Sequence, residues 1–324
     1  STLDEHRARL RALHVDHGLH PDSADWASAN ARLCGELNIP FRSLRISVPD
    51  RAGESPEALA RTARYVALRG EILPGELLLL AHHADDQAET MLLQLLRGAG
   101  PAGLAAMPPC VPFGEGWIGR PLMRFKREEL ERYAAGHGLH WVHDTSNDDT
   151  DIDRNFLRHR IMPLLKDRWP AATFTISRSA RLCAEARSVM DEFANADLDK
   201  LMQEKRLSLA GLINLPIERQ RNIVRAWIRR CGFELPDSRR LLAIFDHVID
   251  AVEDARPEVE WGAVIVRRYR NWLYVHERDA TDSEAPARSD LTRPGESQIV
   301  LGAGAGSMLF EQCESDHPEA RLCW

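Results

Sequence analysis

The chain has 324 residues, of which 44% are hydrophobic and 28% charged, and this composition predicts a soluble globular protein with about two or three domains. Its apolar runs fall short of the roughly 18–20 residues that cross a bilayer, and no charged-then-apolar leader opens it, so we expect a cytoplasmic protein with no membrane partner. The formal net charge of −7 excludes indiscriminate binding to nucleic acid, and six cysteines without CxxC spacing argue against zinc and iron–sulfur sites.

The first half of the chain alternates between short apolar segments and amphipathic segments. Strands are predicted over residues 10–16, 41–48 and 77–81, with a helix after each of them. The first of these helices can be capped by Asp22 or Ser23. Such alternation predicts an α/β domain over residues 1–170, built on a parallel sheet with helices on both faces.

The second half of the chain is predicted to be mainly helical. Helical segments are expected over residues 172–205, 218–230 and 238–252, followed by a hairpin around Arg270 and Asn271. We expect a helical connector over residues 171–206, a small helical domain ending in a hairpin over residues 207–278, and a linker with the start of a truncated C-terminal region over residues 279–324.

The segment HHADDQAET carries the first candidate site. The strand over residues 77–81 ends at His82, and a helix should begin at about Asp85, which places the acidic residues at the carboxyl edge of the sheet, where α/β folds bind ligands. Asp86 and Glu89 share one face of that helix, and the core face is expected to hold Met91, Leu92, Leu95 and Leu96. Two such carboxylates could hold the ammonium group of an amine, or a magnesium ion with its phosphates.

A purely structural role of these residues stays open. Asp85 and Asp86 in the first turn would stabilise the positive helix end by about 0.3–1 kcal/mol each, with Glu89 solvated. A transition-metal site is disfavoured because no further ligands cluster nearby in the sequence.

The helix exit has an unusual glycine content. Gly98, Gly100 and Gly103 surround a single arginine, Arg97, although Gly98 alone could be an ordinary helix C-cap. Guanidinium groups pair well with phosphate oxygens, so Arg97 is a candidate phosphate ligand.

These segments, taken in order, resemble those of a known family. The matching segments are HVDHGL, EALARTARY, HHADDQAET, LRGAGPAGL, RPLM and WVHDTSNDDTDIDRNFLRHRIMPLL. From about residue 10 to residue 165, and more weakly through the helical region, the chain resembles the tRNA(Ile)-lysidine synthetases, which are PP-loop ATP pyrophosphatases.

The resemblance implies a Rossmann-like fold of the adenine nucleotide α-hydrolase type and a bacterial ligase that uses ATP and magnesium. In this family ATP adenylates the C2 oxygen of the wobble cytidine of a minor isoleucine tRNA. The ε-amine of free L-lysine then displaces AMP to give lysidine. The expected partners are therefore isoleucine tRNA and free lysine, with a homodimer left open.

The resemblance also implies residue roles, and none of them is a dedicated metal ligand. Asp86 and Glu89 match the acidic residues that hold the lysine ammonium, and together with Arg97 they are the expected catalytic residues. The expected ATP-binding residues are His14, Asp16, His82, Arg97, Gly98 and Gly100. The expected tRNA-binding residues are Arg154, Asn155, Arg158 and Arg160. A second basic helix carries Arg219, Arg221, Arg225, Arg229 and Arg230, although basic helical faces are commonly just solvated.

One family feature does not occur in the sequence: the SGGxDS loop, whose backbone amides cradle pyrophosphate. We expect this loop to be encoded upstream of Ser1, and we expect a chain without it neither to hydrolyse ATP nor to form lysidine. Two alternatives stay open: an enzyme of the same superfamily that inserts sulfur at C2, which would generally use paired cysteines, and a non-catalytic tRNA-binding module.

Overall fold

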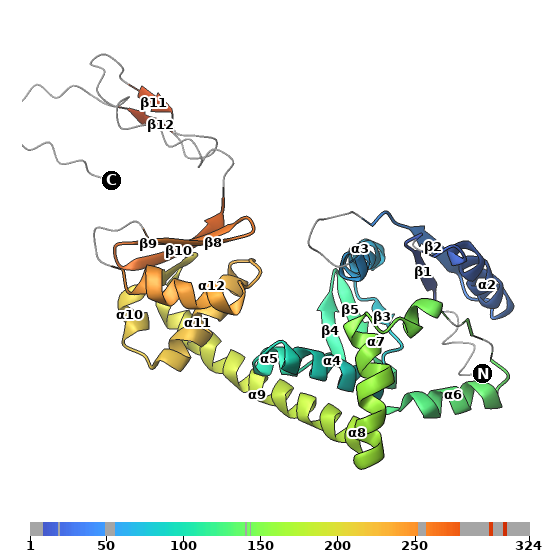
Figure 1. Ribbon diagram of the computed structural model, residues 1–324. Coiled ribbons are helices and arrows are strands. Elements are labelled where there is room, and N and C mark those ends of the chain that lie inside the picture. The colour runs from blue at the N-terminus through green and yellow to red at the C-terminus, as the bar shows by residue number, and fades with distance from the viewer. Residues whose placement is uncertain are drawn as a thin grey trace, which may run out of the picture. The chain divides into compact units, whose positions relative to one another are not determined.

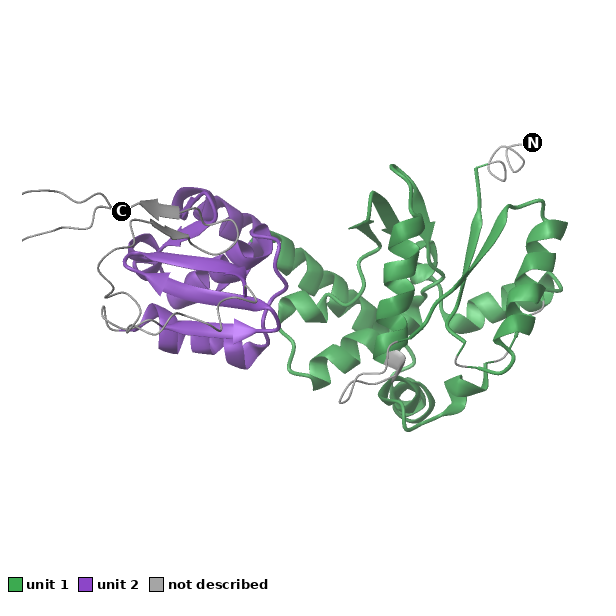
Figure 2. Cartoon of the chain, turned by 90° about the horizontal axis from the view of Figure 1, so that it is seen from above, with its two compact units in different colours: residues 1–189 green, residues 190–324 purple. Residues whose placement is uncertain are grey.

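The computed structural model describes residues 9–18, 20–48, 56–139, 141–142, 144–251, 257–278, 298–300 and 307–309. The chain divides into two compact units, Ser1–Val189 and Met190–Trp324 (Figures 1 and 2). No helix within these described ranges is long and apolar enough to span a membrane.

The first unit begins with a parallel βαβ arrangement. Strand β1 (Ala12–Asp16) pairs in parallel with β2 (Phe41–Arg45), and Ala12 lies opposite Phe41. Helix α2 (Ser23–Glu36) connects these strands. Asp22 occupies its N-cap position but its side chain makes no capping hydrogen bond.

A second sheet contains three strands in the order β3–β5–β4. Strand β3 (Leu77–Leu79) pairs in parallel with β5 (Gly116–Gly119), and β5 pairs antiparallel with β4 (Cys110–Phe113). Helix α3 (Pro56–Glu71) precedes β3, α4 (Ala84–Leu96) follows it, and α5 (Pro101–Leu104) comes next. The unit is α/β, as predicted, but its described strands form two sheets instead of one. The short turn between β4 and β5 forces the antiparallel pairing.

The core of the first unit lies between α3 and these strands. Leu68, Ile72, Phe113 and Ile118 are buried, and side chains of β1 and β3 pack against them. A Cβ atom at Gly116 would lie 2.3 Å from the Glu76 carbonyl oxygen. Only glycine therefore allows the start of β5 to lie this close to the residue that precedes β3.

An ion pair joins the beginning of β1 to the segment before β3. Arg11 Nε donates to Glu76 Oε1 at 2.8 Å. The hydrogen bond from Arg11 is the largest of the effects that lower the pKa of Glu76 to about 2.

The rest of this unit is helical. It contains η1 (Pro121–Arg124), α6 (Arg127–Gly136), η2 (Thr145–Asp148), α7 (Asp153–Phe156), the π-helical η3 (Leu157–Ile161), α8 (Met162–Arg168) and the start of α9 (Ala172–Leu201).

The second unit is more β-rich than its sequence predicts. Five of its described strands form one antiparallel sheet in the order β6–β7–β10–β9–β8. They are β6 (Met202–Gln203), β7 (Arg206–Ser208), β8 (Glu258–Trp261), β9 (Val264–Tyr269) and β10 (Trp272–Glu277). Strands β9 and β10 turn at Arg270 and Asn271, where the alternating sequence predicts a hairpin. Strands of two or three residues, such as β6 and β7, are too short to give a readable alternation.

Helices cover one face of this sheet (Figure 1): α10 (Leu209–Ile213), α11 (Ile217–Arg230), α12 (Ser238–Ala243) and the π-helical η4 (Ile244–Ile249). Between them and the sheet lies a core that includes Leu207, Ile223, Trp227 and Leu273, all fully buried. A separate strand pair follows, β11 (Gln298–Val300) with β12 (Ser307–Leu309). The predicted linker and most of residues 279–324 lie outside the described residues.

The predicted core face of α4 is wrong at its C-terminal end. Leu95 and Leu96 are 54% and 75% exposed, whereas the first two turns of the helix, residues Ala84 to Glu89, are buried. The periodicity identified residues that share a face, but other elements cover only the first half of the helix.

Candidate active site

The N-terminus of α4 is closed by a reciprocal cap. The backbone N–H of His83 donates to Asp86 Oδ2 at 3.0 Å, and the Asp86 N–H donates to His83 Nδ1 at 3.4 Å. Asp86 therefore stabilises the start of α4. This is the purely structural role that the sequence left open for it. Its other carboxylate oxygen, Oδ1, faces away from this cap toward two arginines.

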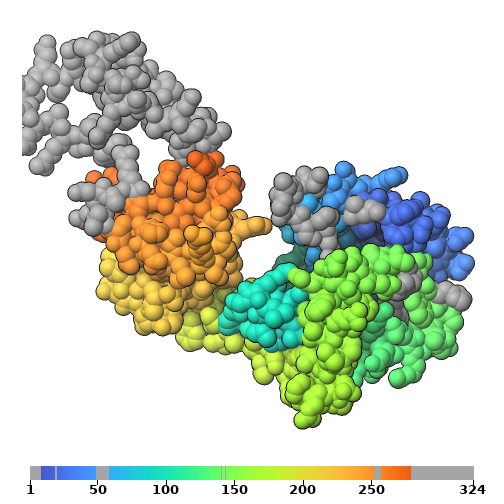
Figure 3. Space-filling model, in the orientation of Figure 1, coloured from blue at the N-terminus to red at the C-terminus, as the bar shows by residue number. Residues whose placement is uncertain are grey.

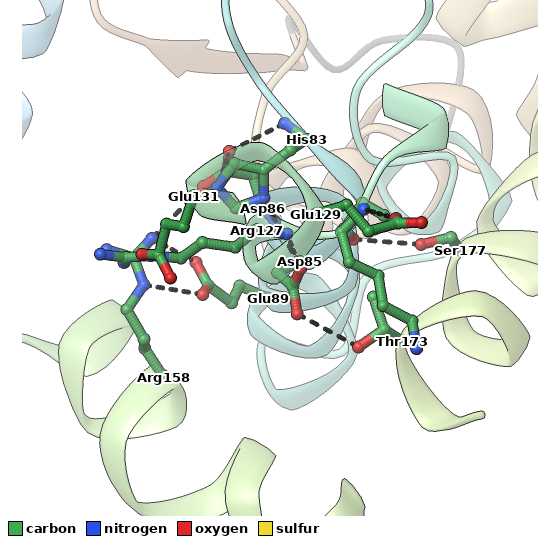
Figure 4. Close-up of polar contacts among 12 residues, drawn as sticks. His83, Asp85, Asp86, Glu89, Arg127, Glu129, Glu131, Arg158, Thr173 and Ser177 are labelled. Carbon is green, nitrogen blue, oxygen red and sulfur yellow. Dashed lines mark hydrogen bonds and ion pairs between the residues drawn. The ribbon is translucent and has the colours of Figure 1, made fainter. Parts of the chain in front are cut away.

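Asp86 and Glu89 form a four-residue ion-pair cluster with Arg154 and Arg158. Arg154 donates from Nε to Glu89 Oε2 and from Nη2 to Asp86 Oδ1, both at 3.0 Å. Arg158 donates from Nε and Nη2 to the two oxygens of Glu89 at 2.8 Å, and from Nη2 to Asp86 Oδ1 at 3.3 Å (Figure 4). The Glu89 side chain is only 2% exposed, and its hydrogen bonds to Arg158 raise the pKa of that guanidinium.

The helical positions explain this geometry. Arg154 and Arg158 are four residues apart and lie on one face of the continuous segment formed by α7 and η3. That segment lies beside α4 on one face of the unit, as the neighbouring teal and green surfaces of Figure 3 show. All four residues of the cluster are predicted site residues. The resemblance implied that Asp86 and Glu89 bind lysine and that the two arginines bind tRNA.

Asp85 points into a different environment. It accepts hydrogen bonds from Lys166 Nζ at 2.7 Å, the Arg127 amide at 2.9 Å and Thr173 Oγ1 at 3.2 Å. Burial alone would raise the pKa of Asp85, but the Arg127 and Lys166 contacts outweigh burial and lower it. Asp85 thus holds α6, α8 and α9 against α4 and is positioned for a structural role.

His82 is a neutral side chain beside the cluster. Burial lowers its pKa to about 4; Asp86 opposes this shift, while Arg120 and Arg154 add to it. Within the described part of the chain, His82 Nδ1 and Arg120 Nε are buried without a hydrogen-bond partner. These two nitrogens therefore have hydrogen-bonding capacity that the described part of the fold does not use. Arg120 is not among the site residues predicted from the sequence, although it lies in the RPLM segment.

The end of β1 presents two more predicted residues. Asp16 accepts a hydrogen bond from the Gly18 amide at 2.8 Å, which is the main reason that its pKa is lowered. His14 Nδ1 lies 3.3 Å from the Asn30 amide nitrogen, and burial lowers its pKa.

Arg97, Gly98 and Gly100 are not brought to this end of α4. Arg97 is the exposed C-cap residue of the helix, roughly 16 Å along its axis from Asp86. Gly98, with φ of +70°, ends the helix in the left-handed conformation, and Gly100 is the N-cap of α5. This geometry is that of an ordinary helix end.

The two other predicted tRNA-binding residues differ in exposure. Asn155 is buried and its amide donates to the Ser146 and Asp149 carbonyl oxygens, both at 2.9 Å, so it holds the loop before α7. Arg160 is exposed.

Two family models match the chain: a PP-loop domain over residues 2–165 and a TilS substrate binding domain over residues 207–274. It is 42% identical to a tRNA(Ile)-lysidine synthase of Coxiella burnetii over 309 residues, which covers 95% of this chain and 68% of that protein. The synthase of Methylococcus capsulatus is 43% identical, with 94% and 69% covered, and that of Vibrio vulnificus is 38% identical, with 96% and 73% covered. The chain belongs to the tRNA(Ile)-lysidine synthase family.

Membership of the tRNA(Ile)-lysidine synthase family confirms the resemblance found in the sequence. It makes the protein a ligase of the PP-loop type, a family that uses ATP. The ion-pair cluster and His82 lie within the PP-loop match, and the basic helix α11 lies within the substrate-binding match. Among the described residues, no three or more His, Cys, Asp or Glu side chains are grouped so as to hold a metal ion.

Proposed function

We propose that this chain serves an enzyme that ligates L-lysine to C2 of the wobble cytidine of a minor isoleucine tRNA, with consumption of ATP and through an adenylated tRNA intermediate, and that the reaction also requires the SGGxDS loop of the family. The observation that carries the proposal is the cluster of two buried carboxylates and two half-buried guanidinium groups within a PP-loop domain. The tRNA substrate implies a reaction in the cytoplasm, and a homodimer stays a prediction.

The cluster is complementary to the main-chain groups of a free amino acid. A zwitterion carries one ammonium and one carboxylate, and the four side chains offer partners for both. Asp86 and Glu89 accept hydrogen bonds from the α-ammonium. Arg154 and Arg158 donate to the α-carboxylate, in the bidentate way that guanidinium groups favour. This role is an alternative to the tRNA contacts predicted for the two arginines, and tRNA contact stays a prediction for them and for the exposed Arg160.

ATP would bind close to the cluster. The partnerless nitrogens His82 Nδ1 and Arg120 Nε fit an anionic or hydrogen-bonding ligand, and Asp16 and His14 lie at the end of a strand in the same unit. Magnesium, which is usually bound through one or two carboxylates and the phosphates, would enter with ATP and neutralise phosphate charge. The ATP roles of Arg97, Gly98 and Gly100 stay predictions from the resemblance alone.

The reaction itself demands mainly positioning. Cytosine C2 is a poor electrophile until its oxygen bonds to the α-phosphorus of ATP and pyrophosphate leaves. The lysine ε-nitrogen then attacks C2, the bond from C2 to oxygen breaks, AMP departs and the nitrogen loses a proton. A site that fixes the α-groups of lysine directs its far end toward C2, and such orientation can supply several kcal/mol.

Incorporation of labelled lysine into minor isoleucine tRNA by the full-length protein that carries the SGGxDS loop, with and without ATP, tests this function. We expect ATP-dependent labelling, and we expect Asp86→Asn to raise the lysine KM by about tenfold or more, because a hydrogen bond between charged groups contributes about 1.5–3 kcal/mol. Cadaverine, which lacks the carboxylate, should compete poorly with lysine.

The matched control is Glu185→Gln, which removes one acid of an exposed ion pair with Arg181 and should leave KM unchanged. Absence of ATP-dependent labelling would contradict the function. Equal competition by cadaverine would contradict the assignment of the arginines.

A further inference from the structure

Helix α11 carries five arginines in fourteen residues. Three of them pair with aspartates of α9: Arg219 with Asp197, Arg229 with Asp191 and Arg230 with Asp199. These three ion pairs fasten one side of α11 to α9, so their guanidinium groups are already used within the fold.

The other two, Arg221 and Arg225, are different. Both are half-buried, and in the described part of the chain neither makes a hydrogen bond or an ion pair; Arg221 Nε is fully buried without a partner. The two side chains are one helical turn apart and therefore share a face. Burial lowers the pKa of Arg225, and the neighbouring charges that add to this shift are Arg221 and Arg229, both positive.

The nearest acid along the helix does not neutralise this pair. Glu218, three residues before Arg221, is exposed and makes no ion pair with a described residue. Arginine stays protonated in proteins, so two positive charges stand side by side in a partly desolvated place. Like charges at this spacing destabilise a helix, and a buried donor without an acceptor costs more. Folding gains nothing from this arrangement, whereas an anionic ligand would compensate both charges.

We propose that Arg221 and Arg225 form a binding site for backbone phosphates of the tRNA substrate. The inference rests on the proposed function, which makes an RNA the polyanion that this protein meets. Guanidinium groups bind phosphate oxygens in bidentate fashion, and both arginines lie within the residues 207–274 that match the substrate-binding model. Arg219, Arg229 and Arg230 are engaged with α9 and position the helix.

Binding of minor isoleucine tRNA by the double variant Arg221→Gln with Arg225→Gln tests the site. We expect affinity about tenfold weaker than that of the unaltered protein, and a salt dependence whose logarithmic slope is smaller by about two, one for each lost phosphate contact. The free energy of unfolding should not fall, because neither side chain has a partner in the fold.

The matched control is Arg240→Gln with Arg278→Gln, which also removes two positive charges from this unit. These arginines form exposed pairs with Asp237 and Glu260, so we expect the slope to stay unchanged. Replacement of Arg221 and Arg225 by lysine should preserve most of the salt dependence of tRNA binding, because lysine keeps the positive charge.

Unchanged tRNA affinity and unchanged salt dependence in the glutamine variant would overturn the proposed phosphate site. They would not contradict the proposed lysidine-forming function. A fall in stability would assign the arginines to the fold and also overturn it. Failure of the unaltered protein to bind tRNA or to incorporate lysine would instead contradict the proposed function.

Discussion

At the scale of single residues, the burial of His82 makes the stability of the fold depend on pH. Its pKa of about 4 in the folded protein lies below the ordinary value of 6.5, because burial disfavours the charged imidazolium. The unfolded chain therefore binds a proton more readily than the folded one. The stability that this histidine contributes is complete above pH 6.5 and is lost as the pH falls toward 4.

We predict that His82→Gln removes this pH dependence. Between pH 7 and pH 5 the unaltered protein should lose about 2 kcal/mol more unfolding free energy than the variant, at ~1.4 kcal/mol for each pH unit below 6.5. Urea unfolding at the two pH values measures the difference. Parallel losses in both proteins would mean that His82 titrates normally.

Some of the site could be predicted from residue spacing. Asp86 and Glu89 were expected to share a face because they are three residues apart, and the structure brings both into one cluster of ion pairs. The pairing of these two acids with Arg154 and Arg158 could not be predicted from spacing. The partners are 65 or more residues away in sequence and meet only through tertiary packing. Arg97 shows the opposite case: it adjoins the cluster in sequence, but a thirteen-residue helix carries it to the far end.

At the scale of elements, the loop before α7 depends on one side chain. The Asn155 amide donates to two backbone carbonyl oxygens of residues 144–149, and Arg154 of the cluster precedes it directly. The sequence predicts that Asn155 binds tRNA together with the basic residues around it. A side-chain amide that could bind RNA can equally well donate to a backbone carbonyl oxygen. Local pattern does not distinguish these roles.

We predict that Asn155→Ala detaches this loop. Loss of two buried hydrogen bonds should lower the unfolding free energy by about 2 kcal/mol and accelerate amide hydrogen exchange over residues 144–149. Asn214→Ala is the matched control, since Asn214 makes one exposed hydrogen bond to the Ala210 carbonyl. Equal exchange in the two variants would show that Asn155 does not hold the loop.

At the scale of the whole molecule, each unit has a core of its own. The sequence predicted the α/β character of the first unit from the alternation of three strands and three helices that begins at residue 10. In the second unit the long helices could be predicted, but a sheet assembled partly from two- and three-residue strands could not, because its register depends on pairing partners distant in sequence.

We predict that Trp227→Ala destabilises the second unit alone. Trp227 is fully buried in that core, and its indole N–H donates to the Lys205 carbonyl at 2.9 Å. Its truncation should cost about 3–5 kcal/mol, seen as faster hydrogen exchange in α11, β7 and β10 with α3 and α4 unchanged. The exposed Trp141→Ala should alter neither unit. Equal acceleration in both units would show that they unfold together.

The composition of the ion-pair cluster has a consequence for the nucleophile. Two acids and two arginines sum to no net charge, and the α-groups of a bound amino acid add none. Because the cluster and the α-groups balance each other, the charge state of the ε-nitrogen depends on what surrounds the far end of the side chain, which in the proposed complex includes the negative phosphate of the adenylated tRNA. Selection of the amino acid through its α-groups would therefore be independent of the activation of its ε-nitrogen.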